Sequence, residues 1–416
     1  MSSRKKWTLG FLLALLGLAL IMGTRPKKCA DGICNDWRLN APTYGLPGAY
    51  QVGRRDFLTD DEPSLAMTIW YPALHQGEGD GEDDYPYEIR IGAPLGVVKI
   101  ASSAGQAAQD MPFDLTQGPY PLVILSPGFA LGAASYGWLA EHLASYGFVV
   151  MAPEHHETLD SQNELWRAAI TRPQDMLTVF AFVDEQMKAG GVLAGLVDAE
   201  NTAVIGHSYG GYTAMAAAGA QIDTASFQAH CAEAVRTEDS TTWLCDMLLP
   251  HMAEMAELAG LDGIPAGLWP TAADSRVDAI VSMAGDAYFF GQPGLAQIDA
   301  PVLVIGGTLD SDTPFHWGPQ PTYDHTSSPR KALLALNDAE HMIFSNTCES
   351  IRWYAKPLVG EFCDDSFWNR NQAHGLIGHF TTAFLLTELK QDADAAAALT
   401  PNAAEFPDIT YAAQGY

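Results

Sequence analysis

The stretch Asn201–Ala220, NTAVIGHSYGGYTAMAAAGA, decides the fold of this chain. It opens with a β-branched, apolar run typical of a buried strand, and it closes with small, helix-prone residues that suit close packing on a sheet. Between the two lies GHSYG, residues 206–210, in which glycines flank a serine because the turn is too sharp and crowded for a Cβ. The stretch therefore predicts strand, tight turn and helix, with Ser208 held at the carboxyl edge of the strand.

Strands and helices alternate on both sides of this stretch. After two β-like segments that begin near Gly48, buried strands are predicted at 120–125, 148–152, 277–283, 300–306 and 331–336, and helices at 135–146, 173–188 and 374–390. Alternation of this kind implies a mostly parallel sheet with helices on both faces. Together with the Gly-x-Ser-x-Gly turn, it predicts an α/β protein with the α/β-hydrolase fold.

Three further regions complete the predicted organisation. The catalytic domain is expected to span residues 29–390, and residues 91–110 have no predicted structure. The alternation breaks at 221–273, which is predicted to be a helical lid over the sheet edge, with a packing extension as the alternative. Residues 391–416 form an Ala-rich, polar C-terminal tail that is expected to pack loosely.

The first 28 residues carry a targeting signal. An uncharged run of about 17 residues, Trp7–Gly23, lies between two basic clusters. This length suits either a signal peptide or an N-terminal membrane anchor. The chain is therefore expected to be exported, to be periplasmic, membrane-anchored or secreted, and to associate with a membrane only through this segment.

Six cysteines agree with export because they fall into three close pairs. Local pairing is the simplest expectation in an oxidising compartment, although six cysteines allow 15 pairings. The expected disulfides are Cys29–Cys34, Cys231–Cys245 and Cys348–Cys363. A metal site is the alternative, and no C-x-x-C spacing favours it.

Composition argues against several kinds of partner. The net charge is −28, and the basic first 28 residues contain no Asp or Glu, so the rest of the chain is more acidic still. Such a surface repels phosphate backbones, which excludes nucleic acid as a partner. The acidic run at 77–84 lacks EF-hand spacing and is expected to be a surface loop. His155 and His156 lack a third ligand in a recognisable pattern and are expected to be structural or pocket-lining, so no metal or cofactor is predicted.

A serine nucleophile needs a base, an orienting acid and donors for the oxyanion. In α/β-hydrolases these groups follow the chain order Ser, acid, His. Asp310, in GGTLDSDTP, follows one buried strand and His341, in NDAEHMIF, follows the next. Ser208, Asp310 and His341 are therefore the predicted catalytic triad. Asp286, in SMAGDAYFF, and Asp312 remain alternatives for the acid.

Two backbone N–H groups are expected to form the oxyanion hole. One belongs to Tyr209, directly after the nucleophile, and the other to Phe129 in the loop SPGF after the first parallel strand. The Met-rich segment 248–260 of the insertion is expected to line a hydrophobic acyl pocket, with Phe129 and residues 288–290 as further walls.

Several motifs together resemble a known group. GAYQVGRRDF, IWYPA, ILSPGF, YGFVVMAPEHHE, RPQDM, GHSYGG and EHMIF occur in this order between Gly48 and Lys390. They resemble the bacterial dienelactone-hydrolase-like lineage, close to platelet-activating-factor acetylhydrolase, whose acid position matches Asp286. True dienelactone hydrolases use cysteine where this chain has Ser208, so dienelactone is a poor substrate. The segment GGTLDSDTP also resembles the acid loop of bacterial cutinases and polyester hydrolases.

The resemblance implies a serine carboxylic-ester hydrolase that works through an acyl-enzyme on hydrophobic or acyl esters. A phospholipase similar to platelet-activating-factor acetylhydrolase and a polyester hydrolase are the alternatives within this class. An alternative of another class is a catalytically silent hydrolase fold that serves as a surface binding protein. Fold alone does not choose among them, since one fold hosts many functions.

Overall fold

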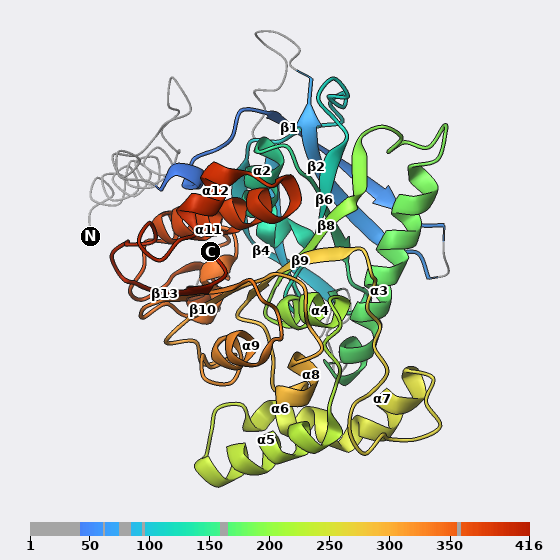
Figure 1. The fold of residues 1–416 in the computed structure, drawn as a ribbon, viewed down its shortest axis with the longest axis vertical. Coiled ribbons are helices and arrows are strands. Elements are labelled where there is room, and N and C mark those ends of the chain that lie inside the picture. The colour runs from blue at the N-terminus through green and yellow to red at the C-terminus, as the bar shows by residue number, and fades with distance from the viewer. Residues whose placement is uncertain (1–41, 61–62, 75–84, 94–95, 159–164, 356–358) are drawn as a thin grey trace, which may run out of the picture. The chain divides into compact units, whose positions relative to one another are not determined.

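The computed structural model describes residues 42–60, 63–74, 85–93, 96–158, 165–355 and 359–416. A ten-stranded sheet runs through them in the order β13-β11-β10-β9-β8-β6-β7-β2-β1-β5 (Figure 1). The six strands from β11 to β7 are parallel, whereas β13, on one side, and β2, on the other, pair antiparallel to them. The strands are β1 (Gln51–Leu58), β2 (Ala66–Ala73), β5 (Ala108–Gln109), β6 (Tyr120–Ser126), β7 (Val149–Glu154), β8 (Val197–His207), β9 (Val277–Met283), β10 (Val302–Gly307), β11 (Lys331–Leu336) and β13 (Ile409–Gln414).

Helices cover both faces of this sheet. Side chains alternate between the faces along each buried strand, so Leu122 and Ile124 join one apolar cluster while Val123 and Leu125 join the other. The first cluster includes residues of α3 (Leu165–Gln186) and α4 (Tyr209–Ala217), and the second includes α2 (Gly137–Ser145) and α11 (Arg370–Lys390). The predicted architecture, a mostly parallel sheet between helical layers, is confirmed. The remaining helices are α5 (Thr224–Thr237), α6 (Thr242–Leu248), α7 (Met252–Leu258), α8 (Gly291–Leu295), α9 (Pro319–His325), α10 (Gly360–Cys363) and α12 (Ala393–Ala398), with the short 3₁₀ helices η2 (Thr43–Gly45), η3 (Ala133–Tyr136), η4 (His156–Thr158), η5 (Leu249–His251) and η6 (His341–Phe344).

One predicted helix starts earlier than expected. The prediction placed Pro173 in the first turn, but α3 begins at Leu165 and Pro173 lies inside it. An interior proline lacks the N–H that would bond to the carbonyl four residues earlier, here that of Ala169. The Tyr212 hydroxyl of α4 donates to this carbonyl oxygen at 2.7 Å. A tertiary contact thus replaces the missing helical hydrogen bond and lets the helix continue.

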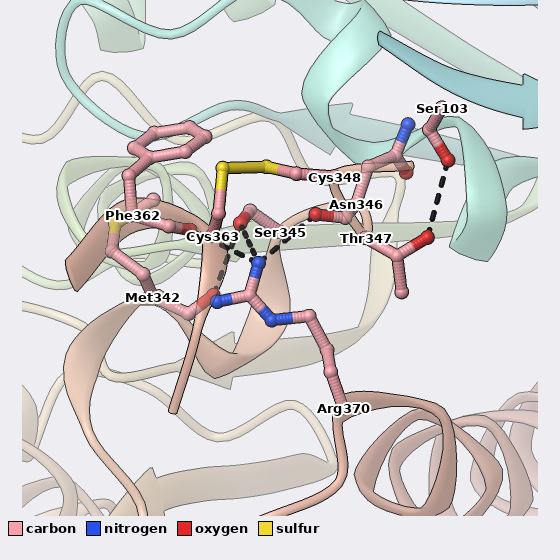
Figure 2. The surroundings of a disulfide bond; sticks show 9 residues. All are labelled: Ser103, Met342, Ser345, Asn346, Thr347, Cys348, Phe362, Cys363 and Arg370. Carbon is pink, nitrogen blue, oxygen red and sulfur yellow. Dashed lines mark hydrogen bonds between the residues drawn. A yellow bond between two sulfur atoms is a disulfide. The ribbon is translucent and has the colours of Figure 1, made fainter. Parts of the chain in front are cut away.

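Most of the region 91–110, which had no predicted structure, joins a second, smaller sheet. It contains β3 (Tyr85–Ala93), β4 (Gly96–Gly105) and β12 (Ser350–Ile351), all antiparallel. A disulfide joins Cys348 to Cys363, as the sequence predicted (Figure 2). It links the segment after η6 to α10 and therefore holds two parts of the chain that border the cleft described below.

The insertion at 221–273 forms helices α5, α6 and α7, and the predicted disulfide Cys231–Cys245 joins α5 to α6. The Met-rich part does not lie where it was expected. Met252 and Met255 of α7 are buried in the core cluster that includes α3, so they contribute to packing and do not face the cleft. The residues of the insertion that line the cleft belong to α6.

The C-terminal tail is not loosely packed. It forms α12 and then β13, which pairs antiparallel with β11 from Ile409 to Gln414. Ala395, Leu399 and Ala404 are buried in the core. This pairing gives hydrogen-bond partners to the backbone N–H and C=O groups at the edge of β11. The Ala-rich composition of the tail does not reveal it, because the partner strand lies far away in the sequence.

Several predictions concern residues outside the described ranges. These are the targeting segment 1–28, the pair Cys29–Cys34 and the acidic run at 77–84. Among the described residues, no helix is both long and apolar enough to span a membrane.

Candidate active site

The turn after β8 holds Ser208 in a backbone conformation that glycine usually adopts. Its φ is 57° and its ψ is −123°, and α4 begins at the next residue. A Cβ on Gly210 would lie 1.9 Å from the Ser126 carbonyl oxygen, and one on Gly206 would lie 2.2 Å from that of Gly210. Both positions therefore require glycine, as the sequence predicted. The turn leaves the Ser208 side chain partly exposed at the carboxyl edge of the sheet.

Three predicted residues form one hydrogen-bonded chain. The Nε2 atom of His341 lies 3.0 Å from Ser208 Oγ, and its Nδ1 atom lies 2.7 Å from Asp310 Oδ2. A carboxylate oxygen can only accept a hydrogen bond, so the contact with Asp310 assigns the N–H of His341 to Nδ1 and leaves Nε2 to accept the serine proton. His341 opens η6 after β11, and Asp310 follows β10. The parallel strands thus bring residues 133 positions apart to one edge.

The two alternative acids take other partners. Asp286 accepts a hydrogen bond from the Thr313 hydroxyl at 2.9 Å, and the Asp312 backbone N–H donates to Asp310 Oδ1 at 2.9 Å. Thr313, which sequence analysis missed, also donates its N–H to Asp310 Oδ1 at 2.8 Å. It therefore links both buried carboxyl groups and holds Asp310 oriented toward His341.

The two buried carboxyl groups and His341 form a coupled electrostatic system. Burial lowers the pKa of His341, but the charge and hydrogen bond of Asp310 outweigh it and raise that pKa to about 9. Burial raises the pKa of Asp286 to about 7, and the charge of Asp310 adds to the increase despite the Thr313 hydrogen bond and His341. Asp310 is the carboxyl group that contacts the imidazole, and burial favours the neutral form of Asp286.

The predicted oxyanion donors border the same cleft. Phe129 and Tyr209 line it together with Ser208 and His341, and their rings meet edge to face at 5.9 Å. In the described part of the chain, neither backbone N–H donates to a protein acceptor. Both groups are therefore free to donate to an oxygen bound near Ser208 Oγ, which is the requirement for an oxyanion hole.

The cleft beside Ser208 has a volume of about 410 Å³ and mostly apolar walls. Phe129 was a predicted wall. Residues 288–290 are not walls: they are buried behind α4, where Phe290 stacks on Tyr212 at 4.9 Å. Sequence analysis also missed several lining residues, which come from α3, from the insertion and from the segments near the second disulfide: Leu165, Trp243, Leu244, Met342 and Phe362.

A buried cation holds Phe362, and the Ser345 hydroxyl donates to the Met342 carbonyl oxygen at 3.0 Å (Figure 2). Arg370 of α11 donates from Nη1 to the carbonyl oxygens of Asn346 and Phe362, both at 3.0 Å, and to Ser345 Oγ at 3.2 Å. With Cys348–Cys363, it ties the η6 segment to α10. This wall of the cleft is therefore fixed by a covalent bond and a multidentate side chain.

The paired histidines lie apart from this chain. His155 is fully buried, bonded to Ser126 and Asp175, and His156 lies 3.5 Å from Asp175 on the outer side. Within the described ranges, no group of three His, Cys, Asp or Glu residues is arranged to hold a metal ion.

Sequence comparisons find a partly matching family model and similar ester hydrolases. A protein-family model described as Chlorophyllase matches residues 111–232. Cutinase est1 of Thermobifida alba is 25% identical over 59% of this chain, and the chain spans 62% of the length of that protein. The bis(hydroxyethyl) terephthalate hydrolase of Streptomyces coelicolor is 23% identical over 78% of this chain and 90% of that protein.

The fold has a solved counterpart. The structure of a ferulic acid esterase from Streptomyces cinnamoneus superposes with a TM-score of 0.55 at 19% identity, over 88% of this chain and 98% of that one. The architecture is therefore the α/β-hydrolase fold, and the relatives named above are carboxylic-ester hydrolases. The resemblance to the dienelactone-hydrolase-like lineage stays a prediction.

Replacing the acid tests its assignment. We expect Asp310→Asn to lower kcat by about 10⁴, because an amide neither fixes the Nδ1–H tautomer nor stabilises the imidazolium. Asp286→Asn is the matched control: it changes a neighbouring buried carboxyl that bonds to Thr313, and it should cost less than tenfold. Steady-state kinetics on folded variants decide the matter. Near-full activity of Asp310→Asn with collapse of Asp286→Asn would move the acid one strand earlier.

The raised pKa of His341 predicts the shape of the pH profile. A protonated imidazole cannot accept the Ser208 proton, so kcat/KM should rise with pH with a midpoint near pH 9, above the range of an ordinary histidine. In Asp310→Asn the carboxylate charge that raises the pKa of His341 is lost. The pH profile of the residual activity should therefore have its midpoint at a lower pH than that of the wild type. Initial rates between pH 5 and 10 measure both profiles. A wild-type midpoint at or below about 6.5 would contradict the prediction.

Proposed function

We propose that this chain is a serine carboxylic-ester hydrolase that acts through an acyl-enzyme. The observation that carries the proposal is the continuous hydrogen-bonded chain from Ser208 through His341 to Asp310 at the floor of an open, apolar cleft. The named relatives, all enzymes that hydrolyse esters, support the same reaction class.

The geometry supports a two-step reaction. Ser208 Oγ attacks the ester carbonyl while His341 Nε2 takes its proton, and Asp310 stabilises the resulting imidazolium. The oxyanion accepts hydrogen bonds from the N–H groups of Phe129 and Tyr209. When the tetrahedral intermediate collapses, His341 returns the proton to the departing alcohol. Water, activated by the same histidine, then releases the acid and restores the serine.

The walls of the cleft support a hydrophobic or aromatic acyl group. Trp243, Phe129 and Phe362 border the space beside Ser208. An adjoining hollow is lined by four carboxylate residues, Asp312, Glu340, Asp364 and Asp365. A negative charge on the substrate would be repelled there. We therefore expect neutral esters to be preferred over esters that also carry a carboxylate.

Two substrate classes follow from these features. A polyester or terephthalate diester fits the apolar cleft and the names of the relatives, whereas a short-chain phospholipid fits the resemblance to platelet-activating-factor acetylhydrolase. A panel of alkyl esters of increasing acyl length, a short-chain phospholipid, a soluble terephthalate diester and its monoester distinguishes them. The diester should be hydrolysed fastest and the monoester, which carries a carboxylate, more slowly.

The organisation of the chain belongs to the same proposal. Residues 1–28 direct export or anchor the protein. The catalytic domain runs from 29 past 390 and includes the C-terminal strand β13, and 221–273 form a lid through α6. The disulfides Cys231–Cys245 and Cys348–Cys363 support an oxidising compartment. N-terminal sequencing of the exported protein tests whether the segment is removed.

A fluorophosphonate probe tests the reaction class. The probe should label the wild-type protein stoichiometrically, because the base activates Ser208, and Ser208→Ala should abolish both labelling and ester hydrolysis. Intact-mass spectrometry measures the adduct. Folded wild-type protein that neither reacts with the probe nor hydrolyses any ester of the panel would favour a silent surface binding protein.

The lid can be tested at Trp243, which lines the cleft and is 47% exposed. Trp243→Ala should raise KM for aromatic acyl esters by about tenfold, because it removes a large aromatic contact. Val235→Ala on α5 removes an exposed apolar side chain of the same insertion away from the cleft and should leave KM unchanged. Equal behaviour of the two variants would show that the insertion only packs against the domain.

A further inference from the structure

The loop after β6 presents one face to the cleft and the other to a buried polar network. In this loop, Pro127, Gly128 and Phe129 follow the strand directly. The Gly128 carbonyl and the Phe129 N–H belong to one planar, trans peptide unit, so they point in opposite directions. Whatever binds the Gly128 carbonyl oxygen from behind therefore sets the direction in which the Phe129 N–H faces the cleft.

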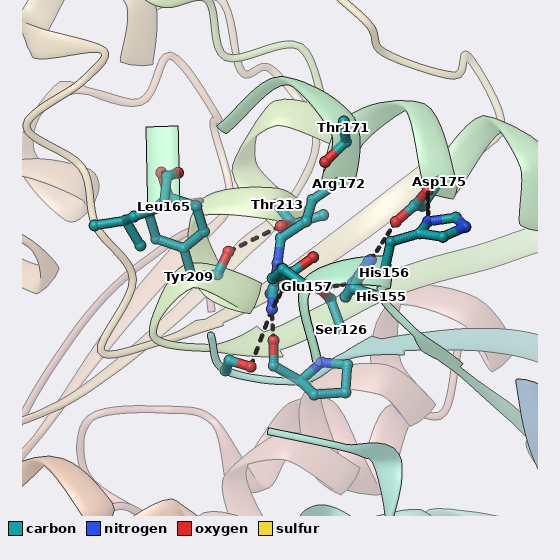
Figure 3. A network of polar contacts seen from close by, with 12 residues as sticks. Ser126, His155, His156, Glu157, Leu165, Thr171, Arg172, Asp175, Tyr209 and Thr213 are labelled. Carbon is teal, nitrogen blue, oxygen red and sulfur yellow. Dashed lines mark hydrogen bonds and ion pairs between the residues drawn. The ribbon is translucent and has the colours of Figure 1, made fainter. Parts of the chain in front are cut away.

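A single guanidinium binds this loop from behind (Figure 3). Arg172 of α3 is completely buried and donates from Nη2 to the Gly128 carbonyl oxygen at 3.0 Å and from Nη1 to that of Pro127 at 2.5 Å. The Gly128 N–H is held separately by the Tyr136 hydroxyl at 3.1 Å. Successive peptide units of the loop are thus fixed on one side, while the Phe129 N–H has no protein acceptor in the described residues.

Arg172 is itself anchored by a buried carboxylate. Its Nε donates to Glu157 Oε1 at 2.5 Å, and Glu157 belongs to η4 after β7. Burial raises the pKa of Glu157, but the charge of Arg172 outweighs it and lowers that pKa below its usual range. The pair is therefore charged, and an ion pair this deeply buried is costly to separate.

A second set of residues fixes the start of the loop. Ser126 Oγ lies 2.9 Å from His155 Nε2, and His155 Nδ1 lies 2.7 Å from Asp175 Oδ2. This repeats the order Ser, His, Asp, but Ser126 and His155 are fully buried and border none of the cleft. No substrate reaches this serine, so the triplet holds β6, β7 and α3 together and does no chemistry.

We propose that Arg172, anchored by Glu157, is a positioning residue for the oxyanion hole: it fixes and polarises the peptide unit whose N–H is that of Phe129. The inference rests on the proposed ester hydrolysis and deepens it. A cation bonded to the carbonyl oxygen withdraws electron density from the amide, which strengthens its N–H as a donor. The effect grows as the substrate oxygen becomes an anion, so it acts on the transition state more than on the bound ester.

Two variants of similar length separate the charge of Arg172 from its bulk. Arg172→Gln removes the positive charge and keeps at most one of the two hydrogen bonds to the loop carbonyl oxygens. Arg172→Lys keeps the positive charge. Arg172→Gln should lower kcat about 10- to 100-fold, somewhat less than the direct loss of an oxyanion donor, with KM within about threefold of wild type. Arg172→Lys should retain more of kcat.

A boronic acid provides a readout that folding alone does not move. Its tetrahedral adduct with Ser208 places a boron-bound oxygen where the oxyanion forms, so Arg172→Gln should weaken its binding by a factor similar to the loss of kcat. Tyr212→Phe is the control, since it removes another buried hydrogen bond to α3, at the Ala169 carbonyl. It should lower the thermal midpoint and leave kcat and boronic-acid affinity unchanged.

Each outcome bears on the inference. If Arg172→Gln does not fold because Glu157 is left unpaired, Arg172→Gln/Glu157→Gln removes both charges and should show the same losses. Folded variants with kcat within threefold of wild type, or a loss of kcat without a matching loss of boronic-acid affinity, would overturn the role of Arg172 alone. Wild-type protein that does not hydrolyse esters, or Ser208→Ala that still does, would instead refute the proposed function and this inference with it.

Discussion

The contact between two backbone segments at the Ser208 turn is the constraint on which the site depends. The elbow and the loop after β6 touch main chain to main chain, because a Cβ on Gly210 would lie 1.9 Å from the Ser126 carbonyl oxygen and 2.7 Å from that of Pro127. Gly211 meets Gly285 in the same way, with 2.7 Å from a Cβ to its Cα atom. Three loops of the parallel sheet thereby converge, which brings Ser208, the N–H groups of Phe129 and Tyr209 and the carboxyl groups to one edge of the sheet.

The two carboxyl groups near His341, those of Asp310 and Asp286, differ in their hydrogen-bond partners and burial. Asp310 accepts hydrogen bonds from two backbone N–H groups and from the imidazole N–H. Asp286 is buried with one hydroxyl donor, and its pKa rises to about 7. Thr313 holds both groups. A second negative charge at this depth would compete for His341, so partial neutralisation of Asp286 leaves Asp310 as the dominant partner of the base.

Burial distinguishes two Ser-His-Asp constellations of similar geometry. The one at Ser208 opens to a cleft, whereas the one at Ser126 is sealed between strands and α3. Hydrogen-bond distances alone would rank them alike, since both contain a 2.7 Å contact between Nδ1 and a carboxylate. Burial lowers the pKa of His155, and the charge of Arg172 lowers it further, so that imidazole stays neutral and structural. Catalytic function requires access to substrate as well as a suitable set of side chains.

The sequence by itself determined the features that depend on local pattern. Apolar runs and the glycines around Ser208 predicted the parallel sheet, and the order of Asp310 and His341 after successive strands predicted which side chains meet at its edge. Only the tertiary structure showed which of the three candidate acids contacts His341, continued α3 through Pro173 by a hydroxyl from another helix, and paired the tail with β11. It also revealed Thr313, Trp243 and Arg172 at the site. These outcomes rest on contacts between residues far apart in the chain, whose geometry no local pattern encodes, because each depends on which buried polar groups find partners after the strands have assembled.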